Sequence, residues 1–86
     1  MAAKRLVWVP LRGQDGWMTD VGSVSYRIRR PSLNNLSQWY LVEVLPPAKF
    51  EGATRAWIKI GRAALEKHAK VMVREFIRNP FPVAQS

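Results

Sequence analysis

The sequence contains no cysteine. This absence excludes disulfide frameworks, thiolate zinc sites and cysteine nucleophiles together. It is also typical of a protein that folds in a reducing cytosol.

Histidine and acidic residues are scarce. His68 is the only histidine, and the six Asp and Glu residues are scattered along the chain. Acid/base and nucleophilic catalysis need a base, an orienting carboxylate and a nucleophile, and a metal loop needs clustered carboxylates. No phosphate-binding glycine motif is present either. We therefore expect no enzyme activity, no catalytic or metal-binding residue and no cofactor, and we interpret His68 as a helix residue at the core boundary.

Long hydrophobic runs are also missing. The N-terminal stretch MAAKRLVWVPL has a short apolar run that Pro10 interrupts. Such a run is too short for a signal peptide core or a transmembrane helix. We expect a cytoplasmic protein with no membrane partner. Its 86 residues predict one domain with one modest core, followed by a C-terminal tail over residues 80–86.

Positive charge, by contrast, is abundant. Fourteen Lys and Arg residues face six Asp and Glu residues, which gives a net charge of +8 and a pI near 10.9. Such a surface attracts nucleic acid, acidic proteins or anionic lipid. The alternative is a soluble protein whose basic charge has no binding role.

A helical period stands out in residues 61–79, GRAALEKHAKVMVREFIRN. At about 100° per residue, one stripe is apolar and the nearly opposite stripe is basic. The apolar stripe contains Leu65, Ala69, Met72 and Phe76, and the basic stripe contains Lys67, Lys70, Arg74 and Arg78. We predict a helix from about Arg62 to Arg78, which Asn79-Pro80 ends.

Alternating apolar and polar residues predict strands before this helix. The ranges are 5–11, 23–29, 38–45 and, as a shorter fourth strand, 54–60, with residues 17–22 leading into the second. An alternative interpretation extends the helix back to Thr54. The predicted fold class is α+β, a three- or four-stranded antiparallel meander with one C-terminal amphipathic helix packed on one face. The apolar stripe should be buried against Val24, Tyr26 and Ile28.

Basic and aromatic residues are the candidate binding residues. Guanidinium groups suit phosphate because they pair with two oxygens at once, and aromatic rings between cations can stack on bases or anchor a protein interface. The candidates are Arg27, Arg29, Arg30, Arg55, Lys59, Lys67, Lys70, Arg74, Arg78, Trp39 and Trp57. The alternatives are a solvated helix face for the cations and a second small core for the tryptophans.

The spacing of Trp17, Val21-Gly22, Tyr26 and Ile28, then Trp39-Tyr40, then Ala63-Ala64 with His68-Ala69-Lys70 resembles small accessory proteins of phages and prophages. The three-strand-plus-helix plan is also similar to that of the arm-binding domains of phage integrases and of plant AP2-type domains. Those domains place the sheet in the DNA major groove. Size and context are similar to those of anti-CRISPR and host-takeover inhibitors.

These observations predict a small, basic, non-enzymatic phage-type protein in the cytoplasm of a bacterial host. It would bind DNA or RNA through its Arg and Lys clusters. The alternative is an inhibitor or adaptor that binds a host nucleic-acid-handling protein, with no small-molecule substrate in either case.

Overall fold

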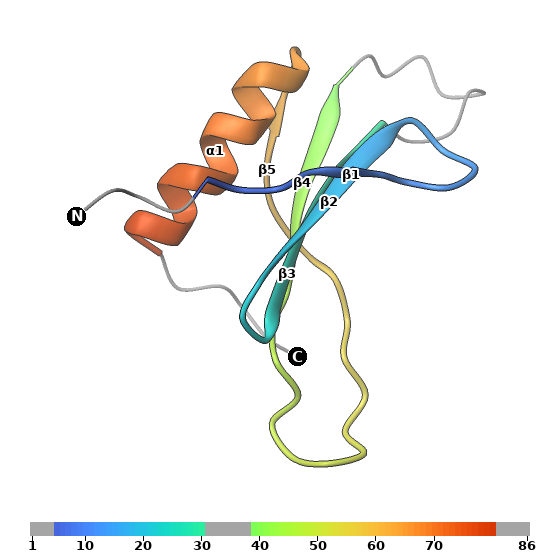
Figure 1. The fold of residues 1–86 in the computed structure, drawn as a ribbon, viewed down its shortest axis with the longest axis vertical. Helices are drawn as coiled ribbons and strands as arrows, with labels where there is room; N and C mark the ends of the chain where they lie inside the picture. The colour runs from blue at the N-terminus through green and yellow to red at the C-terminus, as the bar shows by residue number, and fades with distance from the viewer. Residues whose placement is uncertain (1–4, 31–38, 81–86) are drawn as a thin grey trace.

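The structure, a computed structural model, describes residues 5–30 and 39–80. It contains an antiparallel sheet in the order β1-β2-β3-β4-β5, and one C-terminal helix lies across one face (Figure 1). The elements are β1 (Val9–Pro10), β2 (Gly16–Val21), β3 (Val24–Arg29), β4 (Tyr40–Leu45), β5 (Ile58–Ala63) and α1 (Glu66–Arg78). The predicted α+β meander with a C-terminal helix is therefore confirmed, with five strands instead of three or four. The expected tail beyond Pro80 lies outside the described residues.

The additional strand comes from a hairpin. Residues 17–22 do not simply lead into the second strand, because most of them form β2, which pairs with β3 from Gly16↔Arg29 to Val21↔Val24. Gly22 and Ser23 connect the two strands, and Gly22 has a φ of 63°. Two-residue hairpin turns need positive φ, which glycine adopts without a steric cost. The predicted first strand is correspondingly short, because only Val9 and Pro10 pair with β2.

The fourth strand begins and ends later than predicted. It spans Ile58–Ala63, so the alternative of a helix that extends back to Thr54 is wrong. The pairing with β4 shifts between Val42↔Gly61 and Glu43↔Lys59, which leaves Ile60 as a bulge residue. A bulge inserts one residue and resets the alternation of faces. Lys59 and Arg62 thereby point to one face, although they are three residues apart.

Gly61 lies where β5 passes under the helix. A Cβ atom at this position would come too close to Cε of Met72, so the end of that flexible side chain would have to move. Because β5 continues to Ala63, helix α1 begins only at Glu66, and its N-cap residue is Leu65 in an extended conformation. The predicted start at Arg62 is therefore four residues early, whereas the predicted end at Arg78 is confirmed.

The core lies between α1 and the face of the sheet that we call the helix-covered face. Directly paired residues of neighbouring strands share a face, and two rows cross this one. They are Trp17–Ile28–Val42–Gly61 and Thr19–Tyr26–Val44–Ile58. Ile28 and Val42 are fully buried, as are Ala69 and Val73 on the helix.

The helix is rotated relative to the predicted stripe. Ala69 is buried as expected, and Phe76 meets Tyr26 edge-on with 6.2 Å between the ring centroids. Val73, however, is the other fully buried helix residue, and Leu65 is 49% exposed, so its predicted burial is wrong. Leu65 precedes the first helical turn, and its backbone does not continue the helical spacing.

In the described part of the chain, no helix is long and apolar enough to span a membrane.

Candidate functional site

The sheet face opposite α1 carries the charged residues, and we call it the arginine face. Two cross-strand rows define it: Met18–Arg27–Glu43–Lys59 and Gly16–Arg29–Leu41–Arg62. Alternation along β3 places Arg27 and Arg29 here while Tyr26 and Ile28 enter the core. Four cations and one carboxylate thus lie on two adjacent rows of one surface.

Glu43 is the centre of this face. Its carboxylate accepts hydrogen bonds from Nε of Arg27 and Nε of Arg29, both at 2.7 Å, and a longer one of 3.4 Å from Arg29 Nη2. Glu43 is only 6% exposed, and the arginine side chains are 19% and 28% exposed. One buried carboxylate therefore fixes two guanidinium groups and neutralises only one of their charges.

The arginines also determine the charge state of Glu43. Burial alone would raise the pKa of this carboxyl group, because it disfavours the charged form. Hydrogen bonds from Arg27 and Arg29, together with their charges, outweigh burial and hold the pKa of Glu43 below its ordinary value. The hydrogen bond that Arg29 donates to Glu43 raises the pKa of Arg29. Glu43 is thus a charged carboxylate at neutral pH.

Aromatic rings lie against the cations of this face. The guanidinium of Arg27 is 4.2 Å from the ring centroid of Trp57, and that of Arg62 is 5.0 Å from the ring centroid of Trp39. Both distances are within the range of cation–π attraction. Trp39 is 42% exposed, so part of its surface is accessible to a ligand.

Arg30, which sequence analysis grouped with Arg27 and Arg29, lies apart from them. Its guanidinium is 4.6 Å from the ring centroid of Tyr40 and donates to the Tyr40 hydroxyl at 3.1 Å. It also forms an ion pair with Asp15 at 3.6 Å. Arg30 therefore contacts Tyr40 and Asp15 at the end of the sheet, and it is not a member of the arginine face.

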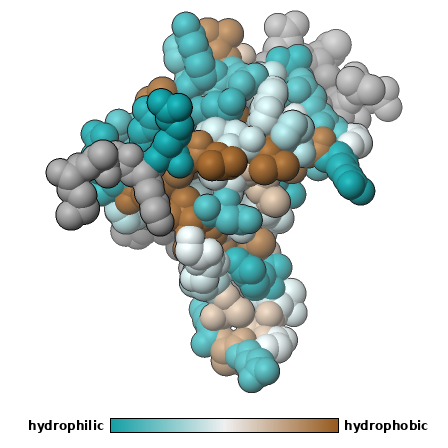
Figure 2. Space-filling model, in the orientation of Figure 1, coloured by the Kyte–Doolittle hydropathy of each residue, from teal (hydrophilic) through white to brown (hydrophobic). Residues whose placement is uncertain are grey.

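Beyond β4 the chain leaves the sheet as a long loop, residues 46–57, which we call the arm. It projects from the end of the sheet where β2 turns into β3 (Figures 1 and 2). Arg55 holds its base by donating to the carbonyl oxygens of Pro46, Ser23 and Leu45 at 2.8, 3.0 and 3.2 Å. The arm is thus attached by one arginine to the ends of two strands and to its own first residue.

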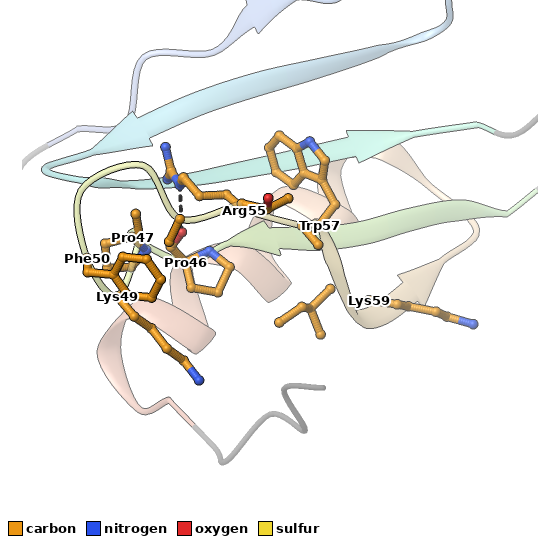
Figure 3. Close-up of a pocket in the computed structure, with 12 residues that line it drawn as sticks. Pro46, Pro47, Lys49, Phe50, Arg55, Trp57 and Lys59 are labelled. Atoms are coloured by element: carbon orange, nitrogen blue, oxygen red, sulfur yellow. Dashed lines mark hydrogen bonds between the residues drawn. The ribbon is translucent and has the colours of Figure 1, made fainter.

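The arm encloses one side of a hollow of about 540 Å³ (Figure 3). Its lining includes two aromatic residues, Phe50 and Trp57, and three cations, Lys49, Arg55 and Lys59, but no acid. Phe50 is 68% exposed. Trp57 and Lys59 belong to the arginine face as well, so the hollow and that face form one continuous surface.

The helix carries a second group of cations on its outer side. Lys67, Arg74 and Arg78 are exposed there, and Arg78 approaches Glu75 at 3.7 Å. Lys70 was predicted to belong to this group, and that placement is wrong. Its Nζ lies 4.9 and 5.7 Å from the ring centroids of Trp17 and Trp8 and pairs with Glu66 at 2.8 Å. The rotation of the helix explains the difference, since it brings Lys70 to the margin of the core.

His68 is exposed on the helix, so its predicted position at the core boundary is wrong. Within residues 5–30 and 39–80, no three His, Asp or Glu side chains are grouped as a metal ion would require. No protein-family model, curated protein or solved structure matches the chain. The chemistry of the two basic surfaces is therefore the basis for assigning a function.

Sequence analysis missed three parts of this site. Arg62 was not among the candidates, because it was predicted to start the helix and instead lies in β5. Glu43 was not among the candidates, because a single acid inside QWYLVEVL gives no indication of its partners until the β3–β4 register is known. Lys49 and Phe50, which line the hollow, were not among the candidates either. The Pro46-Pro47 pair and Gly52, which has a φ of 85°, are the local signals of a long, shaped loop.

Proposed function

We propose that this protein is a non-enzymatic nucleic-acid-binding protein whose contact surface is the arginine face together with the hollow of the arm. The observation that carries the proposal is the composition of this surface. It combines six cations with aromatic rings, and the cations are Arg27, Arg29, Lys49, Arg55, Lys59 and Arg62. Two carboxylates share the sheet face: Glu43, which is paired with two of the arginines, and Asp20 on the next row, which accepts a hydrogen bond from Ser25. Nucleic-acid sites use cations along the phosphate backbone and rings for the bases.

The cations of this surface have different roles in the proposal. Arg27 and Arg29 are tied to Glu43 and supply a fixed positive field with limited access. Lys59 and Arg62 are exposed, and no carboxylate of the described residues pairs with either. We therefore expect Lys59 and Arg62 to make the direct phosphate contacts.

The test compares two double variants that remove equal charge. Lys59→Ala with Arg62→Ala changes the arginine face, whereas Lys67→Ala with Arg74→Ala changes the outer side of α1. Binding of labelled DNA and RNA is followed by fluorescence anisotropy across a salt titration. We expect affinity to fall steeply with salt, and the first variant to reduce the slope by about one to two units.

The second double variant is the control for net charge, and we expect it to keep most of that slope. Equal losses in both variants would mean that binding depends on net charge and has no defined site. Absence of binding to any DNA or RNA at low salt would refute the function itself.

The exposed apolar side chain at the arm favours a second candidate. Phe50 is 68% exposed, and aromatic anchors of this kind are enriched in protein interfaces. A phage-type inhibitor or adaptor could use it to bind a host nucleic-acid-handling protein. Capture from host lysate with and without nuclease separates the two candidates. A protein that binds directly is still captured after nuclease treatment, whereas a protein bridged by nucleic acid is lost.

A further inference from the structure

The hollow of the arm differs from the rest of the basic surface because it is concave. Its volume of about 540 Å³ lies within the range of roughly 300–1,000 Å³ that is typical of small-ligand pockets. A duplex presents its phosphates on a convex surface, and its bases are stacked inside. A concave pocket of this size is instead suited to a base that is not stacked inside a duplex.

The lining of the hollow matches one class of group. Pro46, Pro47 and Phe50 line it on the arm, and Trp57 lines it where the arm returns to the sheet (Figure 3). Flat apolar and aromatic surfaces accept any nucleobase, because every base has a π face. The three charged residues of the lining are all cations, which suits the phosphates on either side of that base.

The walls of this hollow are fixed at its base. Arg55 holds the arm through three backbone carbonyls, and Arg27 lies over the ring of Trp57 while pairing with Glu43. Trp57 is therefore held from the sheet side by a side chain that is itself fixed. A fixed aromatic wall loses little conformational freedom when a ligand stacks on it.

We infer that the nucleic acid is single-stranded and that one unpaired base enters the hollow, where Phe50 and Trp57 are the aromatic residues of the lining on which it stacks. Lys59 and Lys49 then meet the neighbouring phosphates, and the strand continues across the arginine face toward Arg62 and Trp39. This inference rests on the proposed function and specifies its ligand. It assigns the arm the task of distinguishing single strands from duplexes.

The experiment measures the affinity of the full chain for three probes at one salt concentration. These are a thymidine oligonucleotide, the corresponding duplex, and a strand of the same length with abasic sugars replacing its central bases. We expect the thymidine strand to bind most tightly. Loss of one stacked base should weaken binding by about five- to a hundredfold, which corresponds to the usual free energy of base–aromatic stacking.

Phe50→Ala is the variant that tests the arm, since its exposed side chain contributes little to folding. Val71→Ala, on an exposed apolar side chain of α1, is the matched control. We expect Phe50→Ala to lose affinity for the thymidine strand within the same range and to bind the abasic strand and the duplex as the unmodified protein does. Val71→Ala should leave all three affinities unchanged.

Two results overturn the inference while leaving nucleic-acid binding intact. One is equal affinity for the thymidine and abasic strands, and the other is a duplex that binds as tightly as the single strand. A protein that binds none of the probes refutes the proposed function instead. Capture of a nuclease-resistant protein partner that Phe50→Ala abolishes, with no effect of this variant on oligonucleotide affinity, would assign the arm to a protein and also overturn the inference.

Discussion

The two faces of the same sheet are stabilised by different interactions. On the helix-covered face, Ile28 and Val42 are fully buried against α1 and make no use of charge. On the arginine face, the most buried charged group is Glu43, and two arginines fix it. Apolar burial gives stability without presenting any group to a ligand, whereas an excess of cations over carboxylates leaves charge available. The comparison teaches that stability and proposed binding are separated by the alternation of side chains along β3 and β4.

The largest expected effect is on the helix-covered face. Ile28→Ala removes a fully buried side chain between β2, β4 and the helix, and we expect it to lower the free energy of unfolding by about 2–5 kcal/mol. Leu41→Ala, a change of similar size on the arginine face, is the matched control, and it should cost less because Leu41 is only partly buried. Urea denaturation measures both. Equal losses of the free energy of unfolding in the two variants would contradict the conclusion that the two faces are stabilised differently.

Glu43→Gln should have the next largest effect and should act on stability and binding in opposite directions. The amide keeps the shape of the side chain but leaves Arg27 and Arg29 without a counter-charge. Since hydrogen bonds to charged groups contribute about 1.5–3 kcal/mol, we expect a loss of stability of that size. Freed arginine charge should at the same time increase affinity for nucleic acid. A variant with unchanged affinity would show that these arginines do not contribute to the binding field.

The pH dependence of stability tests the same cluster without mutation. The pKa of Glu43 is lower in the folded chain than in the unfolded chain, so the unfolded state binds a proton first as the pH falls. The contribution of Glu43 to the free energy of unfolding is therefore fully present above its ordinary pKa of 4.5 and is lost as the pH falls through its lower folded value. Urea denaturation curves recorded at a series of pH values, from neutral to below the pKa of folded Glu43, should show this decline in the free energy of unfolding. In Glu43→Gln the decline should be shallower.

The smallest expected effect is that of Lys70→Ala at the margin of the helix-covered face. Its ammonium group lies near Trp8 and Trp17 and pairs with Glu66, so we expect a loss of about 0.5–1 kcal/mol. Nucleic-acid affinity should change little, because Lys70 lies on the side of the sheet opposite Lys59 and Arg62. A reduced salt slope in this variant would restore Lys70 to the basic surface that the sequence predicted.

Much of the fold could be predicted because half-buried strands and amphipathic helices have visible periods. The alternation from Val24 to Arg29 correctly separated Tyr26 and Ile28 from the arginines. The period failed at Ile60 and Gly61, where a bulge resets the faces, and β5 continues to Ala63, so the helix starts later than predicted. It also failed at Leu65, which precedes the first helical turn.

The candidate site was predictable only in its composition. Net charge and the presence of Arg27, Arg29, Lys59 and Trp57 indicated a basic, aromatic surface. Their grouping depends on the pairing of Arg27 with Glu43 and of Glu43 with Lys59, and such registers are long-range contacts that no local pattern encodes. The hollow of the arm likewise depends on Arg55 reaching Ser23, 32 residues away in the chain.

Backbone amide chemical-shift mapping with a thymidine oligonucleotide tests the central claim most directly, because it reports both basic surfaces in one titration. We predict shifts along β3, β4 and β5 on the arginine face and through the arm, including Lys49, Phe50, Trp57 and Lys59. Lys67 and Arg74 on the outer side of α1 should remain unchanged. Shifts confined to α1, with the arm and the arginine face unaffected, would contradict the account.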